Sequence, residues 1–507
     1  MSETQTMPHA RMTLCALLLS MAACSPAIAQ SAPGLCAAPA VAAGGPSNAH
    51  TRSLETNLRP PVIKPGDQPL TLAEEMRRYA VPGISVAVFH HGRIAWARGW
   101  GVRDLTSCAP VTPNTAFQAA SISKVVTAVM ALRLVEQGKI GLDRNINESL
   151  RSWQLPKDEK LAPNGVTLRE LLSHTAGLNV HGFDHGYQPG ATLPTTVQIL
   201  EGAGGTPVRS ILPAGAQFEY SGGGYMVAQL ALTDVSGMSF ADLAQREVLG
   251  PLGMTRSAFA MPPSPAIRAD MAFGSAWGKP MPGNYEVMPQ LAPAGLWTTA
   301  GDLARLLIDL QASASGKKGR RLSPAMTRVM MTPVKDNWGL GLALYRDGVP
   351  RFGHDGVNPG FESFMAAYVG KGDGIVVLTN GGDGRRLTNE VVRAVAADYG
   401  WPDIAAPATE EKTLSFAQLS KAAGRFAGSG LNVDLEARPD GLFARFVGAP
   451  ASASERLVAL SPTRFRSEFI GFTVEFAPDF SSFTFIDGAP PMKVMRTGAA
   501  PLAARAD

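Results

Sequence analysis

The sequence has little of what marks several large classes of protein. Only 17% of its 507 residues are charged, and the formal net charge is +4. It contains no Lys/Arg cluster typical of a nucleic-acid-binding surface, and Lys317-Lys318 with Arg320-Arg321 is more typical of a solvated loop. We therefore expect no nucleic-acid partner, and a hydrophobic content of 45% predicts an ordinary globular protein with a sizeable core.

Long apolar runs are also missing beyond the N-terminus. There Arg11 precedes the short apolar run Leu14–Ala23, and Ala27–Ala29 fits a small-x-small cleavage site. This pattern predicts a signal peptide over 1–29 and an exported protein, periplasmic or secreted. A lipoprotein signal ending at Cys24 is the alternative, and it would leave a lipid anchor on that residue. In either case we expect a soluble or lipid-tethered protein without a transmembrane span.

Cysteine is scarce, with 4 in the whole chain. Outside the predicted signal peptide only Cys36 and Cys108 remain. In an oxidising compartment these two could form one disulfide, and the sequence leaves open whether their Cα atoms are close enough.

Several catalytic signatures are absent as well. No G-x-S-x-G motif supports an α/β-hydrolase, and no P-loop or Rossmann glycine fingerprint follows a strand. His181 and His185 with Asp184 have a spacing that could suit a metal, but Gly182 and Gly186 argue against a helix there and no second ligand pair appears. We expect neither a metal nor a cofactor.

The order of the expected elements indicates an α+β fold. Residues 30–70 are rich in Ala, Pro, Gly and Ser and predict a flexible or extended lead-in. Two strands at 84–99 precede a helical middle at 144–270, and strands return after 338 before a helix at 389–399. One sheet would thus take strands from both ends of 71–400, around an inserted helical region. A linker at 401–412 and a small β domain at 413–500, with period-two strands, complete the chain.

The best candidate nucleophile is Ser121 in Ser121-Ile122-Ser123-Lys124. Residues three apart share one face of a helix, so the Lys124 amine would lie beside the Ser121 hydroxyl. The following residues, 125–135, are apolar nearly all round and predict a buried helix. Burial lowers the pKa of a lysine toward the neutral form that can accept a proton.

Two further segments could complete such a site. Tyr220 precedes the glycine-rich turn 222–224, and a tyrosine beside a lysine ammonium is expected to have a lowered pKa and to relay protons. His354-Asp355-Gly356 lies in a glycine-rich stretch that would let a substrate approach the strand backbone. His174, at a helix end, is better explained as a structural, hydrogen-bonded histidine.

Ser121–Lys124, Tyr220–Gly222 and His354–Gly356, in this order, resemble the three motifs of the serine β-lactamase and penicillin-binding-protein superfamily. The nearest branch is the class C-like group of β-lactamase-related hydrolases, which includes family VIII esterases, D-aminopeptidases and D,D-peptidases. Supporting phrases are Leu171–Leu178, Pro251–Met254 and Ala294–Leu303. The resemblance covers about 71–400 and implies a β-lactamase/transpeptidase-like antiparallel sheet flanked by helices. The tail resembles a small β domain that some members carry.

The resemblance also implies roles. Ser121 would be the acylated nucleophile, and Lys124 its base or the cation that holds Tyr220 as a phenolate. Tyr220 would carry the proton to the leaving group and later activate the deacylating water. The backbone N–H groups of Ser121 and Val357 would form the oxyanion hole. His354 would stand near the substrate carboxylate or the tyrosine oxygen.

Two positions depart from the superfamily pattern. Gly222 and Gly356 would line the substrate site, but Gly222 stands where an asparagine is usual. His354 replaces a lysine, so a fixed positive charge is missing near neutral pH. The sequence therefore predicts a serine hydrolase acting through an acyl-enzyme on small-molecule ester, amide or D-amino-acid peptide substrates rather than on β-lactams. A β-lactamase, or a weakly catalytic or non-catalytic peptidoglycan- or penicillin-binding or regulatory relative, remains the alternative.

Overall fold

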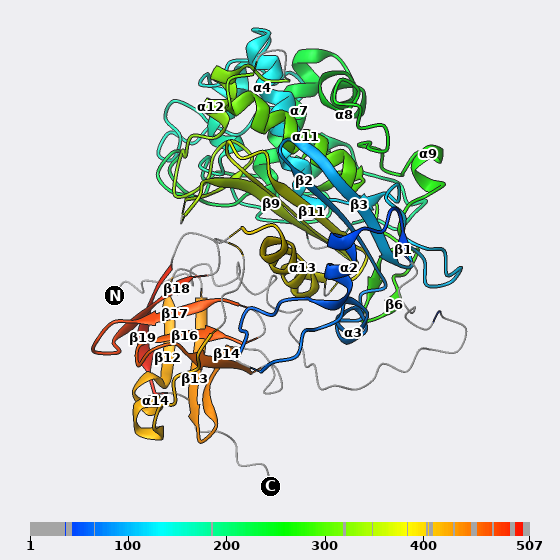
Figure 1. Cartoon of the computed structure of the whole chain (residues 1–507). Helices are drawn as coiled ribbons and strands as arrows, with labels where there is room; N and C mark the ends of the chain where they lie inside the picture. The colour runs from blue at the N-terminus through cyan, green and yellow to red at the C-terminus, as the bar shows by residue number, and fades with distance from the viewer. Residues whose placement is uncertain are drawn as a thin grey trace, which may run out of the picture. The chain divides into compact units, whose positions relative to one another are not determined.

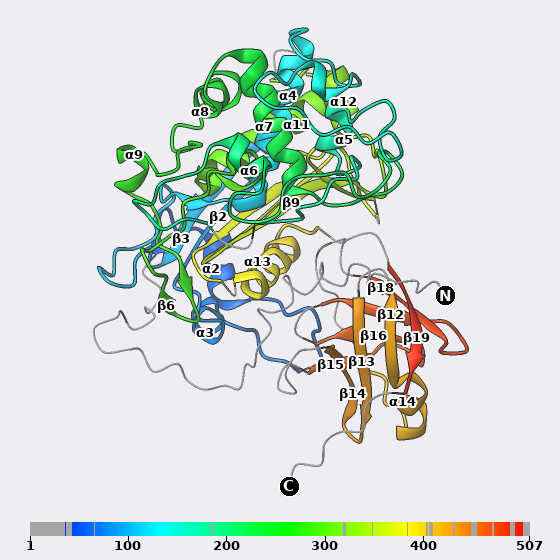
Figure 2. The same cartoon turned by 180° about the vertical axis from the view of Figure 1, so that it is seen from behind.

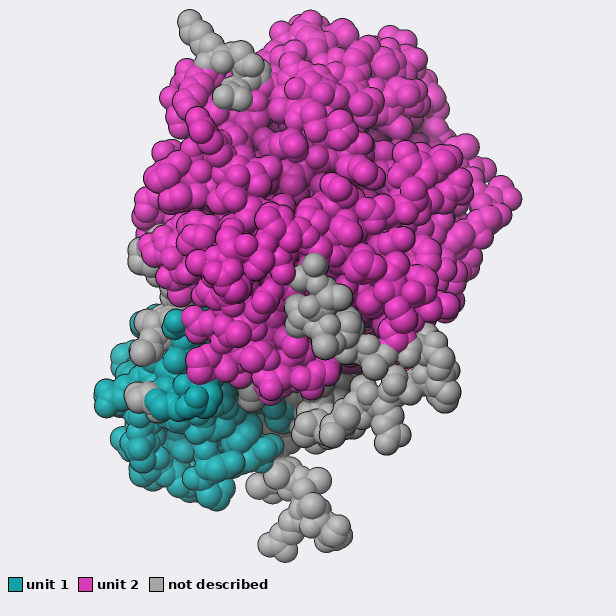
Figure 3. Space-filling model, turned by 45° about the vertical axis from the view of Figure 1, so that its right-hand side comes forward, with its two compact units in different colours: residues 1–27, 59–68, 406–507 teal, residues 28–58, 69–405 magenta. Residues whose placement is uncertain are grey.

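The structure is a computed structural model that describes residues 36, 43–64, 66–183, 186–317, 321–346, 348–382, 384–401, 404, 409–428, 431–447, 454–468, 471–486 and 492–499. The described residues fall into two compact units, coloured in Figure 3. The larger takes in residues from 28–58 and 69–405, and the smaller takes in residues from 59–68 and 406–507. The predicted signal peptide at 1–29 and the alternative anchor at Cys24 lie outside the described residues, as does much of the predicted linker 401–412.

An antiparallel sheet forms the centre of the larger unit (Figure 1). Its order is β1-β3-β2-β11-β10-β9-β8, so strands from both ends of the unit lie side by side, which confirms the predicted α+β fold. The strands are β1 Ala43–Gly44, β2 Gly83–His90, β3 Arg93–Gly101, β8 Ala343–Tyr345, β9 Arg351–Asn358, β10 Phe361–Tyr368 and β11 Gly374–Thr379.

Both faces of this sheet are covered, since successive residues of its central strands β2 and β11 are buried almost throughout. In β2, Ala87 and Phe89 belong to one buried cluster, and Val86 and Val88 belong to another. The first cluster includes helices α4 Ser123–Glu136, α7 Gly222–Ser236 and α11 Ala300–Ala314, and the second includes α2 Ala49–Thr56, α3 Leu72–Arg78 and α13 Gly384–Asp398. Figures 1 and 2 show α13 and α2 on the opposite side of the sheet from α4 and α7.

In the sequence, the remaining elements of the larger unit lie between β3 and β9. They are mostly short helices with Ser or Thr caps, as the capping rules predict. Their bounds are β4 Phe117–Gln118, η1 Ala120–Ile122, η2 Ile146–Glu148, α5 Leu168–Leu172, α6 Thr196–Leu200, α8 Phe240–Ala244, η3 Gln245–Leu249, α9 Pro265–Arg268, β5 Ser275–Ala276, β6 Lys279–Pro280, α10 Leu291–Ala294, β7 Trp297–Thr298 and α12 Pro324–Met330.

The expected flexible or extended lead-in over 30–70 needs correction. It contains α2, which begins with a capping box between Asn48 and Thr51, and the short strand β1 pairs with β3. A disulfide joins Cys36 to Cys108, whose Cα atoms are 5.7 Å apart, so the pairing that the sequence left open is present.

The smaller unit is a closed antiparallel barrel, β12 to β19, preceded by one helix, α14 Phe416–Ala422. Its interior is filled by apolar side chains, including Phe426, Phe465 and Phe483, so the barrel encloses a packed core. The predicted all-β C-terminal fold is confirmed. The strands are β12 Gly424–Gly428, β13 Leu431–Arg438, β14 Gly441–Phe446, β15 Glu455–Ala459, β16 Arg464–Ser467, β17 Thr473–Phe476, β18 Ser482–Ile486 and β19 Met492–Gly498.

Among the described residues, none of the helices has the length and apolar character needed to cross a membrane.

Candidate active site

Ser121 lies in the tight turn η1 that joins β4 to α4. The preceding residue, Ala120, has a φ of 48°, a left-handed conformation that residues with a Cβ rarely adopt. Contacts on both sides hold this backbone: Ala119 N–H donates to the Leu296 carbonyl at 2.9 Å, and the Ser363 hydroxyl donates to the Ala119 carbonyl at 2.9 Å. Strained backbone held by its surroundings is a common property of functional turns.

The predicted contact between Ser121 and Lys124 is present. Lys124 Nζ lies 2.9 Å from Ser121 Oγ and donates to the Pro293 carbonyl at 3.0 Å. The lysine is only 2% exposed. Burial lowers its pKa from 10.5 to about 7, although the Asp355 carboxylate acts in the opposite direction. A large fraction of Lys124 is therefore neutral at physiological pH, and its lone pair can accept the Ser121 proton.

Tyr220 lies beside Lys124. Its position is held by the next residue, Ser221, which caps the N-terminus of helix α7. The Ser221 hydroxyl accepts from Gly224 N–H at 2.9 Å and donates to the Asn179 carbonyl at 2.6 Å. Lys124 Nζ lies 4.9 Å from the centre of the Tyr220 ring.

The expected lowering of the Tyr220 pKa is wrong. Burial raises this pKa, and a side-chain hydrogen bond with Ser121 offsets only part of the rise. The neighbouring Lys124 carries only about half of a positive charge at pH 7, because its own pKa is about 7, and this does not offset the effect of burial on Tyr220. Tyr220 is consequently a neutral phenol in the resting site, which is the form that can donate a proton.

His174 has the structural position that the sequence predicts. Its Nδ1 accepts a hydrogen bond from Ser221 N–H at 3.0 Å, and its ring stacks on Tyr220 with 4.1 Å between centroids. Burial keeps its pKa well below 6.5, so the ring is neutral. This histidine fixes the start of α7 and the plane of the tyrosine ring.

Strand β9 brings the third segment beside Ser121. A Cβ on Gly356 would lie 2.4 Å from the Ala119 carbonyl oxygen and 2.9 Å from Ser121 N, so only glycine lets the strand approach this closely. Strand β8 pairs with β9 only at 351–353, so in the described part of the chain residues 354–358 have β10 on one edge and no strand on the other. The Val357 side chain on this stretch is 51% exposed. An extended substrate could therefore bind along this edge.

His354 is buried in the site rather than lying on the surface. Its Nδ1 donates to the Asp355 carbonyl, and burial lowers its pKa to about 4 despite the opposing effect of the Asp355 carboxylate. The ring centroid lies 6.5 Å from that of Tyr220. Among the described residues, His354 Nε2 has no hydrogen-bond partner. A neutral imidazole with an unpaired acceptor nitrogen therefore occupies the position where a cation would be expected.

In the sequence, His181 was considered only as part of a possible metal spacing, whereas the structure places its ring beside Tyr220. The segment around it folds onto the start of α7, where the His181 carbonyl accepts from Gly222 N–H at 3.0 Å. A Cβ on Gly222 would lie 3.0 Å from the Phe183 ring, so this segment fills the space of a larger side chain. The His181 ring lies 4.9 Å from that of Tyr220. No local pattern in the sequence predicts this contact, because it depends on a loop that returns from about 40 residues away. The metal spacing that was considered at His181, Asp184 and His185 includes residues 184–185, which lie outside the described residues.

Comparisons with known proteins identify the family of this chain. A family model described as Beta-lactamase matches residues 70–398. Penicillin-binding protein 4 of Amycolatopsis lactamdurans is 28% identical over 363 residues, which cover 67% of this chain and 92% of that protein. Unguisins hydrolase ungD of Aspergillus violaceofuscus (strain CBS 115571) is 25% identical over 353 residues, covering 62% of this chain but only 61% of that hydrolase.

A solved structure with the same fold is that of the octameric penicillin-binding protein homologue from Pyrococcus abyssi. It has a TM-score of 0.57 at 23% identity and covers 83% of this chain and 98% of that chain. At this identity the likeness supports the fold alone.

Proposed function

This chain belongs to the beta-lactamase family, and from that premise we propose that it is an exported serine hydrolase that forms an acyl-enzyme on ester or amide bonds. A general serine hydrolase function is supported by the family and by the hydrolase among the relatives. One observation carries the proposal furthest. The buried amine of Lys124, about half of which is neutral at pH 7, lies 2.9 Å from the Ser121 hydroxyl.

In the proposed acylation step, the Lys124 lone pair takes the Ser121 proton while Oγ attacks the substrate carbonyl carbon. The backbone N–H groups of Ser121 and Val357 are assigned to the carbonyl oxygen as its negative charge develops. The amine remains oriented during this step, because it donates to the Pro293 carbonyl. Burial makes ammonium formation costly, which is why the pKa stays near 7 and matches the task of a base at neutral pH.

Collapse of the tetrahedral intermediate needs a proton on the leaving oxygen or nitrogen. Tyr220 is a neutral phenol and is assigned to give that proton, then to regain one from the Lys124 ammonium, so both groups return to their resting states. Deacylation runs these transfers in reverse, with water in place of the leaving group. The water proton passes to Tyr220 as the phenol passes its own proton to Lys124, and the resulting ammonium protonates Ser121 Oγ as the acyl bond breaks. The neutral rings of His181 and His354 have centroids 4.9 Å and 6.5 Å from that of Tyr220, and they are assigned to position substrate.

The charge of the site supports uncharged substrates. His354 has a pKa of about 4, and the neighbouring cation Arg385 is 3.0 Å from the Asp355 carboxylate and thus compensated. His354 is therefore uncharged at neutral pH and offers no cation to the carboxylate of a β-lactam or of a peptide C-terminus. We rank small esters and D-amino-acid amides or peptides above β-lactams. The Cys36–Cys108 disulfide supports export, since such bonds persist in oxidising compartments.

A parallel assay tests the proposal. Wild type and Ser121→Ala would be compared on a short-chain p-nitrophenyl ester, a D-alanyl p-nitroanilide and nitrocefin. We expect hydrolysis of the ester or the D-alanyl amide above nitrocefin, and its loss in Ser121→Ala. Equal hydrolysis by both proteins would reject this site, and nitrocefin as the best substrate would reject the ranking.

A further inference from the structure

A second cluster of functional side chains lies at one end of the sheet, where two turns meet. The β2–β3 turn and the β10–β11 turn are joined by a hydrogen bond from Gly92 N–H to the Gly372 carbonyl at 2.8 Å. Gly372 has a φ of 78°, and a Cβ on it would lie 2.6 Å from Gly92 N. Glycine is required for this approach, so the backbone keeps the two turns at a fixed separation.

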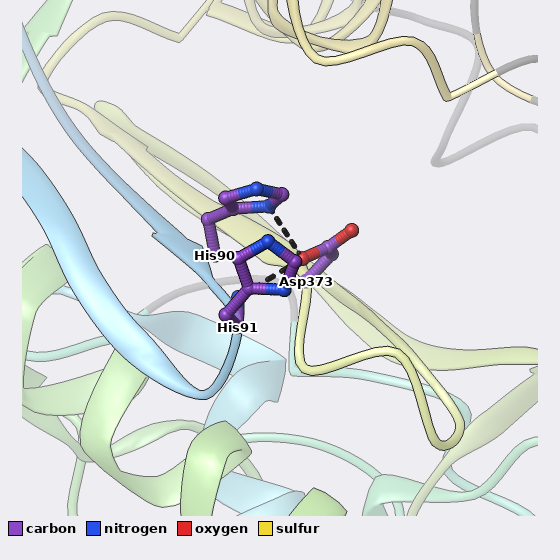
Figure 4. Close-up of side chains that lie close together, drawn as sticks. All are labelled: His90, His91 and Asp373. Atoms are coloured by element: carbon purple, nitrogen blue, oxygen red, sulfur yellow. Dashed lines mark hydrogen bonds and ion pairs between the residues drawn. The ribbon is translucent and has the colours of Figure 1, made fainter.

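Three potential metal ligands gather across this contact (Figure 4). His90 ends β2 and His91 follows in the first turn, while Asp373 comes from the second turn, and one ligand atom of each lies within 4.8 Å of the others. Asp373 is buried, with 7% exposure, whereas His91 is exposed and leaves the cluster open to solvent. Two imidazoles and a carboxylate suit Zn²⁺ and related divalent transition metals better than Mg²⁺ or Ca²⁺.

We propose that His90, His91 and Asp373 form a binding site for one divalent transition-metal ion of the Zn²⁺ type. His90 Nδ1 and Asp373 Oδ1 are 2.7 Å apart. In a tetrahedral zinc site with bonds of about 2.0 Å, neighbouring ligand atoms are about 3.3 Å apart. An ion that replaces the proton between these atoms therefore needs the ring and the carboxylate to separate by only about half an ångström. Water would complete the coordination on the exposed side.

The local backbone brings the two imidazoles to the same side. Consecutive residues of a strand normally point to opposite faces. Here His91 has a φ of 52°, and the β2–β3 register shifts between Val88 and Phe89. As a result the ring centroids of His90 and His91 are only 3.7 Å apart. Both rings can therefore face one ion.

Surrounding contacts hold the ligands in place, as outer contacts do in known metal sites. The Asp373 side chain also accepts from His91 N–H at 3.2 Å, and its backbone carbonyl accepts from the Gln311 side chain at 2.8 Å. The His90 ring lies edge-on to Tyr399, with 5.3 Å between centroids, and the Tyr399 hydroxyl accepts from Trp96 at 3.0 Å. A bound ion would cross-link the two turns and stabilise this end of the sheet. It takes no part in the reaction proposed for Ser121.

Isothermal titration of the EDTA-treated full chain with ZnCl₂ tests the site. We expect one saturable site per chain and a rise of the unfolding temperature that depends on Zn²⁺ concentration. His91→Asn should weaken binding at least about tenfold, because asparagine tolerates the left-handed backbone but removes the imidazole. His50→Asn is the matched control, since His50 is a solvent-exposed histidine paired with Asp398 outside the trio. It should bind like wild type.

Zinc-edge X-ray absorption of the loaded wild type supplies a readout that needs no variant, and it should show two imidazole ligands. Absence of saturable binding, full affinity in His91→Asn, loss of binding in His50→Asn, or a zinc ion without imidazole ligands would each overturn the proposal. Ester hydrolysis is measured separately, and it should be the same with and without Zn²⁺.

Discussion

Replacing Lys124 by methionine should stabilise the protein while it abolishes catalysis. The lysine is 2% exposed, and its pKa falls from 10.5 to about 7. One pKa unit corresponds to about 1.4 kcal/mol, so the protonated amine is disfavoured in the folded protein by about 5 kcal/mol, roughly 4 of which remain at pH 7. Methionine has a similar shape and removes this cost. It leaves the Pro293 carbonyl without its donor, which costs about 1–3 kcal/mol. The net expectation is a gain of about 1–3 kcal/mol at pH 7.

The pH dependence gives the sign of the effect. Between about pH 7 and 10.5 the unfolded chain keeps a proton on Lys124 that the folded chain has released. Folding stability of the wild type should therefore rise with pH across this window, and the Lys124→Met variant should lack that contribution. The advantage of the variant is largest at and below pH 7 and disappears toward pH 10.5.

Urea unfolding followed by tryptophan fluorescence at several pH values measures the stability, and hydrolysis of a p-nitrophenyl ester measures the activity. We expect a loss of at least about a thousandfold in kcat/KM, the upper range for removal of a general base. Lys139→Met changes an exposed lysine and should leave both quantities nearly unchanged. A Lys124→Met variant that is less stable than wild type at pH 7, or that keeps its activity, would refute the reasoning.

Four other outcomes follow. The kcat/KM of the wild type should rise with pH through an apparent pKa of about 7 as Lys124 loses its proton, and a rate profile flat between about pH 6 and 8 would contradict this. Gly356→Ala should lower kcat about a hundredfold at unchanged circular dichroism, because its Cβ would displace β9 from Ser121 N; full activity would contradict the close approach. Gly222→Asn, although it restores the usual residue of the superfamily, should lose ester hydrolysis without gaining nitrocefin hydrolysis, since the side chain would displace the Phe183 ring. Cys36→Ser should lower the free energy of unfolding by about 2–4 kcal/mol, because the disulfide closes a separation of 72 residues; urea curves that coincide with wild type would contradict this.

Local spacing was enough to predict the centre of the site. Ser121 and Lys124 are three residues apart, and the apolar run after them predicts a buried helix, so both their contact and the lowered lysine pKa could be inferred from sequence. The order of strands and helices likewise predicts a sheet with strands from both ends of the larger unit. The Ser121–Lys124 contact depends on neighbours within one turn of helix, and each strand is recognisable from its own residues. That the strands from both ends share one sheet was inferred from the order of the elements along the chain.

Features that depend on distant segments could not be predicted in this way. The raised pKa of Tyr220 results from burial by several loops, whereas the sequence showed only a possible lysine neighbour. His181 reaches the tyrosine because its loop returns onto the start of α7. His90 and Asp373 are 283 residues apart and meet only through the register of β2 with β11. No local pattern reports such a pairing.

Intact-protein mass spectrometry after reaction with a fluorophosphonate serine probe tests the central claim most directly. We predict one adduct per chain, located by peptide mapping on Ser121, with labelling that accelerates as pH rises through about 7 and is strongly reduced in Lys124→Met. Labelling of Ser121→Ala to the same extent as wild type, or an adduct on a different residue, would contradict the assignment of Ser121 as the nucleophile.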